Sequence, residues 1–162
     1  MMKNSAYSLG TTLQHPLVIK FGDKVTERLD VLLKTEGYAS QIENGCKVIN
    51  LDKTERLTRP HAREYNETMD FAIGLDIIQM LLVELKLRVK NPVNIKAKDL
   101  EDKIKYSKVL LGSDIAISSD RVFIFKKSVL PQARNHISRL FCNRSNYKTL
   151  TVDEFIGIYS VK

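Results

Sequence analysis

The 162-residue chain contains little of what builds disulfide-stapled, zinc-binding or membrane-spanning proteins. It has two cysteines, Cys46 and Cys142, and neither has a second cysteine or a histidine at metal-ligand spacing. A disulfide framework and a structural zinc site are therefore excluded. No apolar run reaches the about 18 residues that a membrane span needs, and the first residues lack the apolar stretch of a secretory signal. We expect a cytoplasmic protein without a membrane partner.

Tryptophan is absent and aromatic residues make up 7% of the chain, which argues against an aromatic platform that stacks the bases of single strands. Positive charge is abundant instead, because 26 Lys and Arg residues against 19 Asp and Glu residues give a net charge of +7. Such a chain favours a polyanionic partner such as DNA. With 43% hydrophobic and 28% charged residues, the composition is typical of one globular domain rather than of a disordered protein.

Hydrophobic spacing and turn residues predict a flexible N-terminal arm over residues 1–16, a core over 17–127 and a C-terminal helical extension over 128–162. The predicted strands are 17–21, 39–42 and 46–49 around an Asn44-Gly45 turn (or a single strand there), 67–73, 78–89, 115–117 and 122–125. The predicted helices are 23–38, 98–111, 130–141 and a short last helix opened by a capping box at 151–154, with 53–65 as a surface loop. This order predicts an α/β (α+β) fold with helices flanking one mixed sheet.

The segment 67–90 can form either one long buried helix or two strands. Residues 83–90 alternate strictly between apolar and charged side chains. The charged members of this alternation are Glu84, Lys86, Arg88 and Lys90. A helix would bury some of these charges in an otherwise apolar rod, whereas a strand places all four on one face. We therefore predict two antiparallel strands, with residues 74–76 as their connection.

On two such strands, Glu84 and Lys86 share a face, and Asp70 can lie within about 5–8 Å of them. Two carboxylates and an ammonium group suit phosphodiester hydrolysis, because carboxylates hold hard divalent cations such as Mg²⁺ or Mn²⁺. The lysine can orient the attacking water or neutralise charge on the phosphorane. Other basic residues are expected to contact the DNA backbone. This nucleic-acid-binding set is Arg88, Lys90, Lys98, Arg134, His136 and Arg139, with Lys96 and Lys103 close by in the sequence.

The stretch 69–71 (MDF), followed by 83–86 (VELK), resembles the signature of the PD-(D/E)XK nuclease superfamily, with methionine in place of the usual proline. Residues 23–126 further resemble archaeal Holliday junction resolvases and related small endonucleases, whose core order is α-β-β-β-α-β. The resemblance implies a magnesium-dependent endonuclease with Mg²⁺ (or Mn²⁺) as its cofactor. It also implies a homodimer, since members that act on DNA junctions must cut two strands.

Site residues follow from the same resemblance. Asp70 and Glu84 would bind the metal through their carboxylates, with the Leu85 carbonyl as a further ligand, and Lys86 would be catalytic. The family often carries a glutamate on its first helix, and Glu27 is the nearest match in this chain. On a helix over 23–38, however, Glu27 would point away from the apolar face and into water. Glu64 is the other candidate for this fourth acidic position.

Three functions are compatible with these patterns. The first is a metal-dependent endonuclease acting on branched, mismatched or otherwise distorted DNA. The second is a non-catalytic basic DNA-binding protein, in which Asp70 and the Glu84–Lys86 pair are ordinary polar groups of a strand end or a solvated strand face. The third is a protein-interaction module in which residues 67–90 form a central helix. A helix across 67–90 would separate the three side chains and would contradict the first function.

Overall fold

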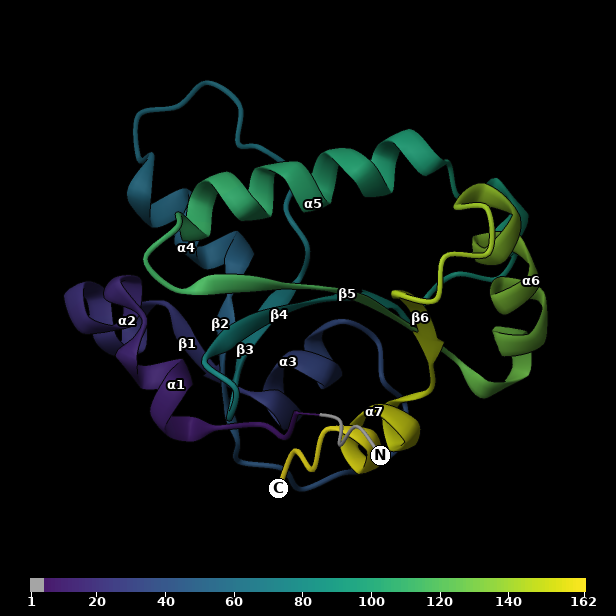
Figure 1. Ribbon diagram of the computed structural model, residues 1–162, viewed down its shortest axis with the longest axis horizontal. Coiled ribbons are helices and arrows are strands. Elements are labelled where there is room, and N and C mark those ends of the chain that lie inside the picture. The colour runs from purple at the N-terminus through teal and green to yellow at the C-terminus, as the bar shows by residue number, and fades with distance from the viewer. Residues whose placement is uncertain (1–4) are drawn as a thin grey trace.

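A mixed six-stranded β-sheet forms the centre of the computed structural model, which describes residues 5–162 (Figure 1). The strands are β1 (Thr26–Arg28), β2 (Lys47–Asn50), β3 (Phe71–Leu75), β4 (Gln79–Lys86), β5 (Ala116–Phe125) and β6 (Tyr147–Leu150). They lie side by side in the order of the sequence, antiparallel from β1 to β4 and parallel from β4 to β6. The predicted α+β class with one mixed sheet is confirmed.

Helices cover both faces of this sheet. They are α1 (Leu9–Gln14), α2 (Pro16–Phe21), α3 (Leu29–Thr35), α4 (Leu51–Thr58), α5 (Ala97–Leu111), α6 (Leu130–Leu140) and α7 (Val152–Ile158). One hydrophobic core lies between the sheet and α3 with α7, and a second lies between the sheet and α4, α5 and α6 (Figure 1). Successive side chains of β4 point to opposite faces of the sheet. Leu81, Val83 and Leu85 therefore lie in the first core, and Met80 and Leu82 lie in the second.

The strand interpretation of segment 67–90 is confirmed. β3 and β4 pair antiparallel, with Phe71 opposite Val83, and their connection lies at 76–78, slightly later than predicted. The backbone N–H of Asp70 donates to the Val83 carbonyl at 3.1 Å, which extends the pairing one residue beyond β3. This register places Asp70 beside Glu84.

Several local predictions also hold. The predicted helix 98–111 is α5, which ends at Gly112, a residue with positive φ. The predicted helix 130–141 is α6. The capping box is present, because the Thr151 side chain accepts from the Glu154 backbone while the Glu154 side chain accepts from the Thr151 backbone.

The predicted helix 23–38 is wrong in its first third, which forms β1 instead. Apolar residues at helical spacing suggested one continuous face. In the structure Val25 belongs to the core under α4 and α5, whereas Leu29 and Leu33 belong to the core on the opposite side of the sheet. Val25 and the leucines therefore do not form one helix face, although their spacing in the sequence matches one. Along the chain, α4 also lies between β2 and β3 and interrupts the predicted α-β-β-β-α-β order.

The N-terminal arm is better ordered than predicted. Residues 1–4 of the predicted arm, 1–16, lie outside the described residues. After them, Tyr7 forms a β-bridge with Leu75, and α1 then packs against β3. Backbone hydrogen bonds that the sequence pattern does not reveal hold this segment on the sheet.

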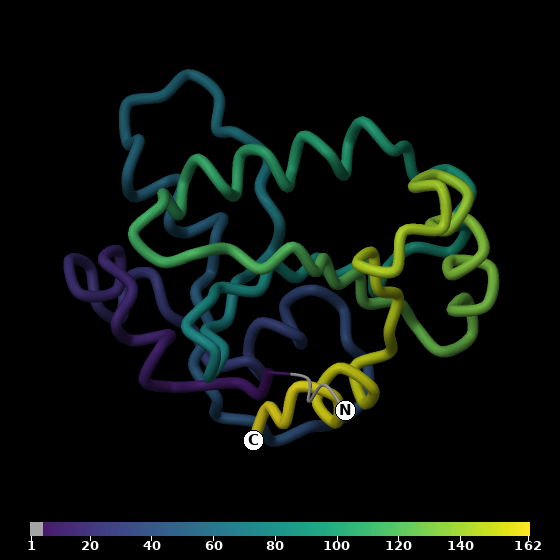
Figure 2. Tube along the Cα trace, in the orientation of Figure 1, coloured from purple at the N-terminus to yellow at the C-terminus, as the bar shows by residue number. Residues whose placement is uncertain are grey.

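Two predictions near proline are also wrong. The predicted strand 17–21 is α2, because Pro16 occupies its first turn and the His15 side chain caps its N-terminus. The predicted loop 53–65 contains most of α4, which ends before Pro60. Proline ended that helix rather than excluding it. The remainder of the loop projects beyond α4 before the chain returns to β3 (Figure 2).

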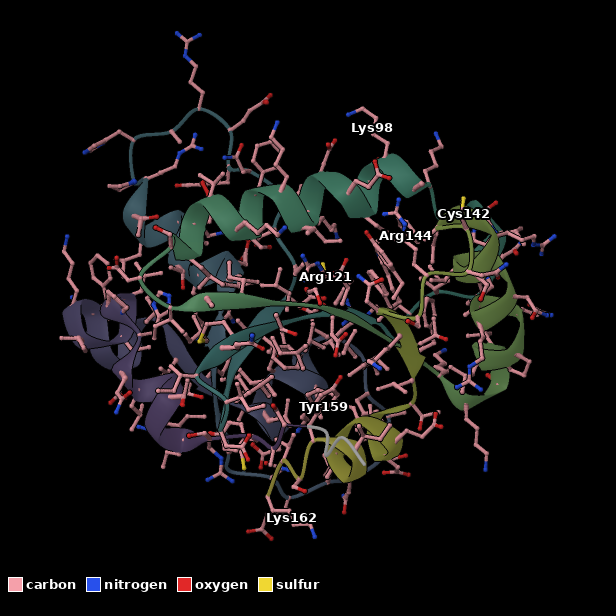
Figure 3. The ribbon with its side chains drawn as sticks, in the orientation of Figure 1. Lys98, Arg121, Cys142, Arg144, Tyr159 and Lys162 are labelled. Carbon is pink, nitrogen blue, oxygen red and sulfur yellow. The ribbon has the colours of Figure 1, made fainter. Side chains whose placement is uncertain are left out.

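The predicted strands 115–117 and 122–125 are one strand, β5. The polar residues between them, read as a turn, form an irregularity in the pairing with β4. Arg121, labelled near the centre of Figure 3, is buried there and donates to the carbonyls of Ser118 and Asp120. These hydrogen bonds let a polar stretch remain within the sheet.

Residues 128–162 contribute to the same sheet and cores as the rest of the chain. Besides α6 and α7, they form β6, which pairs parallel with β5, whereas the sequence suggested only helices and a polar connection there. Leu150, Val152 and Phe155 lie in the core beneath α3. Within residues 5–162, no helix has both the length and the apolar character needed to cross a membrane.

Candidate active site

Three side chains predicted to act together meet where the β3–β4 pairing ends. Asp70 immediately precedes β3, and Glu84 and Lys86 lie on β4, both on the face toward α5. The Lys86 Nζ atom lies 3.2 Å from Glu84 Oε2. The backbone N–H of Leu85 donates to Asp70 Oδ2 at 2.6 Å and fixes the position of that carboxyl group. The geometry therefore juxtaposes two carboxyl groups and one ammonium group.

The Asp70 carboxyl group is perturbed by this arrangement. Burial, the neighbouring Glu84 charge and a hydrogen bond with Glu84 raise the pKa of Asp70 from 3.8 to about 9, although the Leu85 N–H opposes the shift. Asp70 therefore keeps a proton at neutral pH. In that form it can donate to Glu84, which has one oxygen, Oε1, that is buried and has no hydrogen-bond donor among the described residues.

Glu84 also forms an ion pair with Lys103, a residue of α5. Its side chain is 1% exposed, and its Oε2 atom accepts from Lys103 Nζ at 2.5 Å. Burial lowers the pKa of Lys103, but the charges of Glu84 and Asp70 and the hydrogen bond outweigh it and raise the pKa overall. Sequence analysis missed this pairing. The available signal is that Lys103 lies on the face of α5 that carries the buried residues Leu100 and Ser107.

An acidic cavity of about 430 Å³ opens beside these groups. Its charged lining consists of Glu27, Glu36, Asp52, Lys53, Glu67, Asp70 and Lys103. Four carboxylates and the protonated Asp70, against two ammonium groups, make this cavity attractive to cations. Three of its acidic residues, at positions 36, 52 and 67, were not predicted as site residues.

Glu27 lies in the acidic cavity, contrary to the expectation that it points into water. The expectation assumed a helix, but Glu27 is on β1, and its side chain is only 14% exposed. Its Oε2 accepts from Asn50 Nδ2 at 2.7 Å and lies 3.7 Å from Lys53 Nζ. Glu64, the other candidate, is exposed in the loop after α4 and does not line the cavity.

The donor groups here fit a hard divalent cation. Asp70 and Glu84 offer carboxylate oxygens, and one buried Glu84 oxygen has no donor within residues 5–162. The Leu85 carbonyl lies on the same side of β4 as its N–H, which points to Asp70. In the part of the chain that the structure describes, no three His, Cys, Asp or Glu side chains are grouped to hold a metal. A cation would thus rely on two carboxylates, a backbone carbonyl and water.

A basic cleft of about 510 Å³ is lined in part by Lys86. Its polar and charged lining consists of Lys86, Arg88, Lys90, Asn91, Asn94, Lys96 and Asp99. Four cationic groups against one carboxylate suit the phosphates of a nucleic acid. Glu84 connects the two spaces, because it pairs with Lys86 of the basic cleft and with Lys103 of the acidic cavity.

Two of the predicted DNA-binding residues on or near the basic cleft are engaged with the protein itself. Arg88 donates to the Thr35 carbonyl at 2.8 Å, which ties the end of β4 to α3. The Nε2–H of His136 donates to the carbonyl of Ile95, a residue that lines the basic cleft, at 2.8 Å. Lys90 is exposed in the basic cleft, as predicted for a phosphate contact.

The remaining three predicted DNA-binding residues lie outside the basic cleft lining. Lys98 projects from α5 into solvent and pairs with Asp102 at 2.9 Å (Figure 3). Arg134 donates to the Thr149 carbonyl at 3.0 Å and thereby joins α6 to β6. Arg139 is exposed on α6. The structure thus does not bring the whole predicted set together.

Ser107 connects α5 to the backbone that presents Asp70. Its buried hydroxyl accepts from the Met69 N–H at 2.8 Å and donates to the Lys103 carbonyl at 2.7 Å. Ser107→Ala leaves the Met69 N–H without its acceptor, so we expect the free energy of unfolding to fall by about 1–3 kcal/mol. Urea denaturation measures this loss. Ser138→Ala, at a partly exposed position of α6, is the control, and an equal effect there would contradict the role of Ser107.

Comparison of the chain with protein-family models, with curated proteins and with solved structures finds no match.

Proposed function

We propose that this protein is a metal-dependent endonuclease that hydrolyses DNA phosphodiester bonds at branched or otherwise distorted sites, and that it belongs to the PD-(D/E)XK nuclease superfamily whose signature it resembles. The observation that carries the proposal is the meeting of Asp70, Glu84 and Lys86 at the end of the β3–β4 pairing. The acidic cavity and the basic cleft on either side support it. The expected homodimer and cytoplasmic location stay predictions.

In the proposed reaction, different residues of the site bind the metal, act on the phosphate and hold the DNA. Asp70, Glu84 and the Leu85 carbonyl would hold Mg²⁺ or Mn²⁺, and the Leu85 N–H keeps Asp70 in position. When bound, such an ion polarises the phosphate and lowers the pKa of the attacking water. Lys86 lies between Glu84 and the basic cleft, where its ammonium group can orient water or neutralise the charge that develops on the phosphorane. Lys90 and Lys96 bind neighbouring phosphates.

A cleavage assay with Lys86→Met tests this proposal. We expect the wild-type protein to cut DNA with Mg²⁺ or Mn²⁺ and not with EDTA, and the variant to cut at least about 10²-fold more slowly while still binding DNA. Four-way junction, flap, mismatched and plain duplex substrates measured in parallel identify the preferred structure.

Lys108→Met removes the same charge from an exposed position of α5 and is the control for a loss of general electrostatic attraction. Metal-independent cleavage, or equal rates for Lys86→Met and wild type, would contradict the proposal. DNA binding without any metal-stimulated cleavage would favour a non-catalytic DNA-binding protein.

A further inference from the structure

Lys103 makes a closer ion pair with Glu84 than Lys86 does, although Lys86 is the lysine of the nuclease signature. Its Nζ atom lies 2.5 Å from Glu84 Oε2, whereas Lys86 Nζ lies 3.2 Å from the same oxygen. The two lysines come from different elements, α5 and β4. The oxygen of Glu84 that accepts hydrogen bonds is therefore covered by an ammonium group on the side of α5.

Lys103 and Lys86 differ in where they lie relative to the site. Lys103 lines the acidic cavity together with Asp70, while Lys86 lines the basic cleft. A cation shared by Asp70 and Glu84 would approach from the acidic cavity. It would meet Lys103 first, and an ammonium group and a dication on one carboxylate repel each other strongly in a partly buried site.

We propose that Lys103 is the resident counter-ion of Glu84, which occupies that carboxylate in the metal-free protein and is displaced from it by a divalent cation. The inference rests on the proposed function, because it concerns the same site. Glu84 is 1% exposed, so its charge needs close compensation in the metal-free fold, and Lys103 supplies the nearer of its two ammonium partners. Lys103 provides that closer compensation before a cation arrives, and its departure is part of cation binding.

The side chain of Lys103 can move without disturbing α5. The Ser107 hydroxyl donates to the Lys103 backbone carbonyl at 2.7 Å. This hydrogen bond holds the main chain of α5 at Lys103 and leaves the lysine side chain free to move. The four-carbon stem is flexible, and Glu67 in the acidic cavity offers a second carboxylate to the displaced ammonium group. An arginine at this position would instead bind Glu84 with a rigid two-pronged fork.

Calorimetric titration with Mn²⁺ alone, without DNA, tests the inference. We expect Lys103→Met to bind Mn²⁺ about tenfold more tightly than wild type or better, because no ion pair has to be broken. Lys103→Arg should bind Mn²⁺ more weakly than wild type. Lys108→Met, which removes an exposed charge from the same helix, should leave the affinity unchanged. Thermal unfolding gives a second readout, since metal-free Lys103→Met should melt lower and gain more from Mn²⁺ than wild type.

If Lys103→Met binds Mn²⁺ as well as wild type or more weakly, the inference about Lys103 is overturned, and the proposed function is not. Should that variant fail to fold, Lys103→Arg decides, and wild-type affinity in it overturns the inference. Asp70→Asn separates this failure from failure of the proposed function. If wild type binds no Mn²⁺, or if Asp70→Asn binds it as well as wild type does, both the proposed function and the inference are overturned.

Discussion

Asp70→Asn is expected to stabilise the protein while it abolishes cleavage. Asparagine can accept from the Leu85 N–H through its carbonyl and donate to Glu84 through its amide, as protonated Asp70 can, without carrying a charge. We expect a gain of about 2 kcal/mol in the free energy of unfolding at pH 7. Cleavage should fall by about 10³-fold, because a carboxylate that would hold the metal is lost.

The gain from Asp70→Asn should depend on pH. The pKa of Asp70 is raised in the folded protein, to about 9 from 3.8, so its contribution to stability is fully present below about pH 4 and is lost as the pH rises through about 9. The difference in free energy of unfolding between variant and wild type should therefore grow across this range. Urea denaturation at several pH values measures it in metal-free buffer.

Asp102→Asn, on the exposed side of α5, is the matched control for Asp70→Asn. It removes a carboxylate that pairs with Lys98 at the surface, so its effect on stability should be small at every pH. A destabilised Asp70→Asn protein, or a difference that shrinks as the pH rises, would show that Asp70 is not held in a protonated state by Glu84.

Substitution of Gly74 is expected to cause the largest loss of stability. The helix α1 packs directly on this residue, whose N–H donates to Thr12 Oγ1 at 2.9 Å. A Cβ atom at position 74 would collide with the backbone N of Thr12 and lie 2.7 Å from the carbonyl carbon of Thr11. Because rigid backbone cannot make room, we expect Gly74→Val to lower the free energy of unfolding by about 4 kcal/mol or more.

Gly157→Ala provides the control for this loss. Gly157 lies in α7, and a Cβ atom there would meet nothing within 4 Å, so alanine should be neutral or stabilise the helix by up to about 1 kcal/mol. Hydrogen exchange locates the effect of the Gly74 variant, which should expose the amides of α1 first. Wild-type stability in Gly74→Val would mean that α1 does not pack on β3 in solution.

The pairing of β3 with β4 could be predicted because its signal is local. Residues 83–90 alternate with period two, and a helix would bury their charges. The antiparallel pairing then brings Asp70 beside Glu84 and Lys86, as predicted. The helices α5 and α6 were predictable for the same reason, since each has a continuous apolar stripe and clear ends.

The side chains that surround Asp70, Glu84 and Lys86 could not be predicted in the same way. Glu27 was assigned to a helix because its apolar neighbours have helical spacing, yet they belong to opposite sides of the sheet. Lys103 shares a face of α5 with the buried residues Leu100 and Ser107, which indicates that it faces the sheet but not that it meets Glu84 there. Both errors concern contacts between residues that are far apart in the sequence.

By itself, the sequence determined the charge of the chain, its mixed α+β class, the two central strands and the three residues at their end. These features depend on side-chain periodicity over a few residues, which sterics and solvation decide locally. The tertiary structure alone decided that Glu27 enters the acidic cavity, that Lys103 covers Glu84, and that residues 128–162 complete the sheet. Those outcomes depend on how distant segments pack, because burial and ion pairing are properties of the assembled fold and not of any one segment.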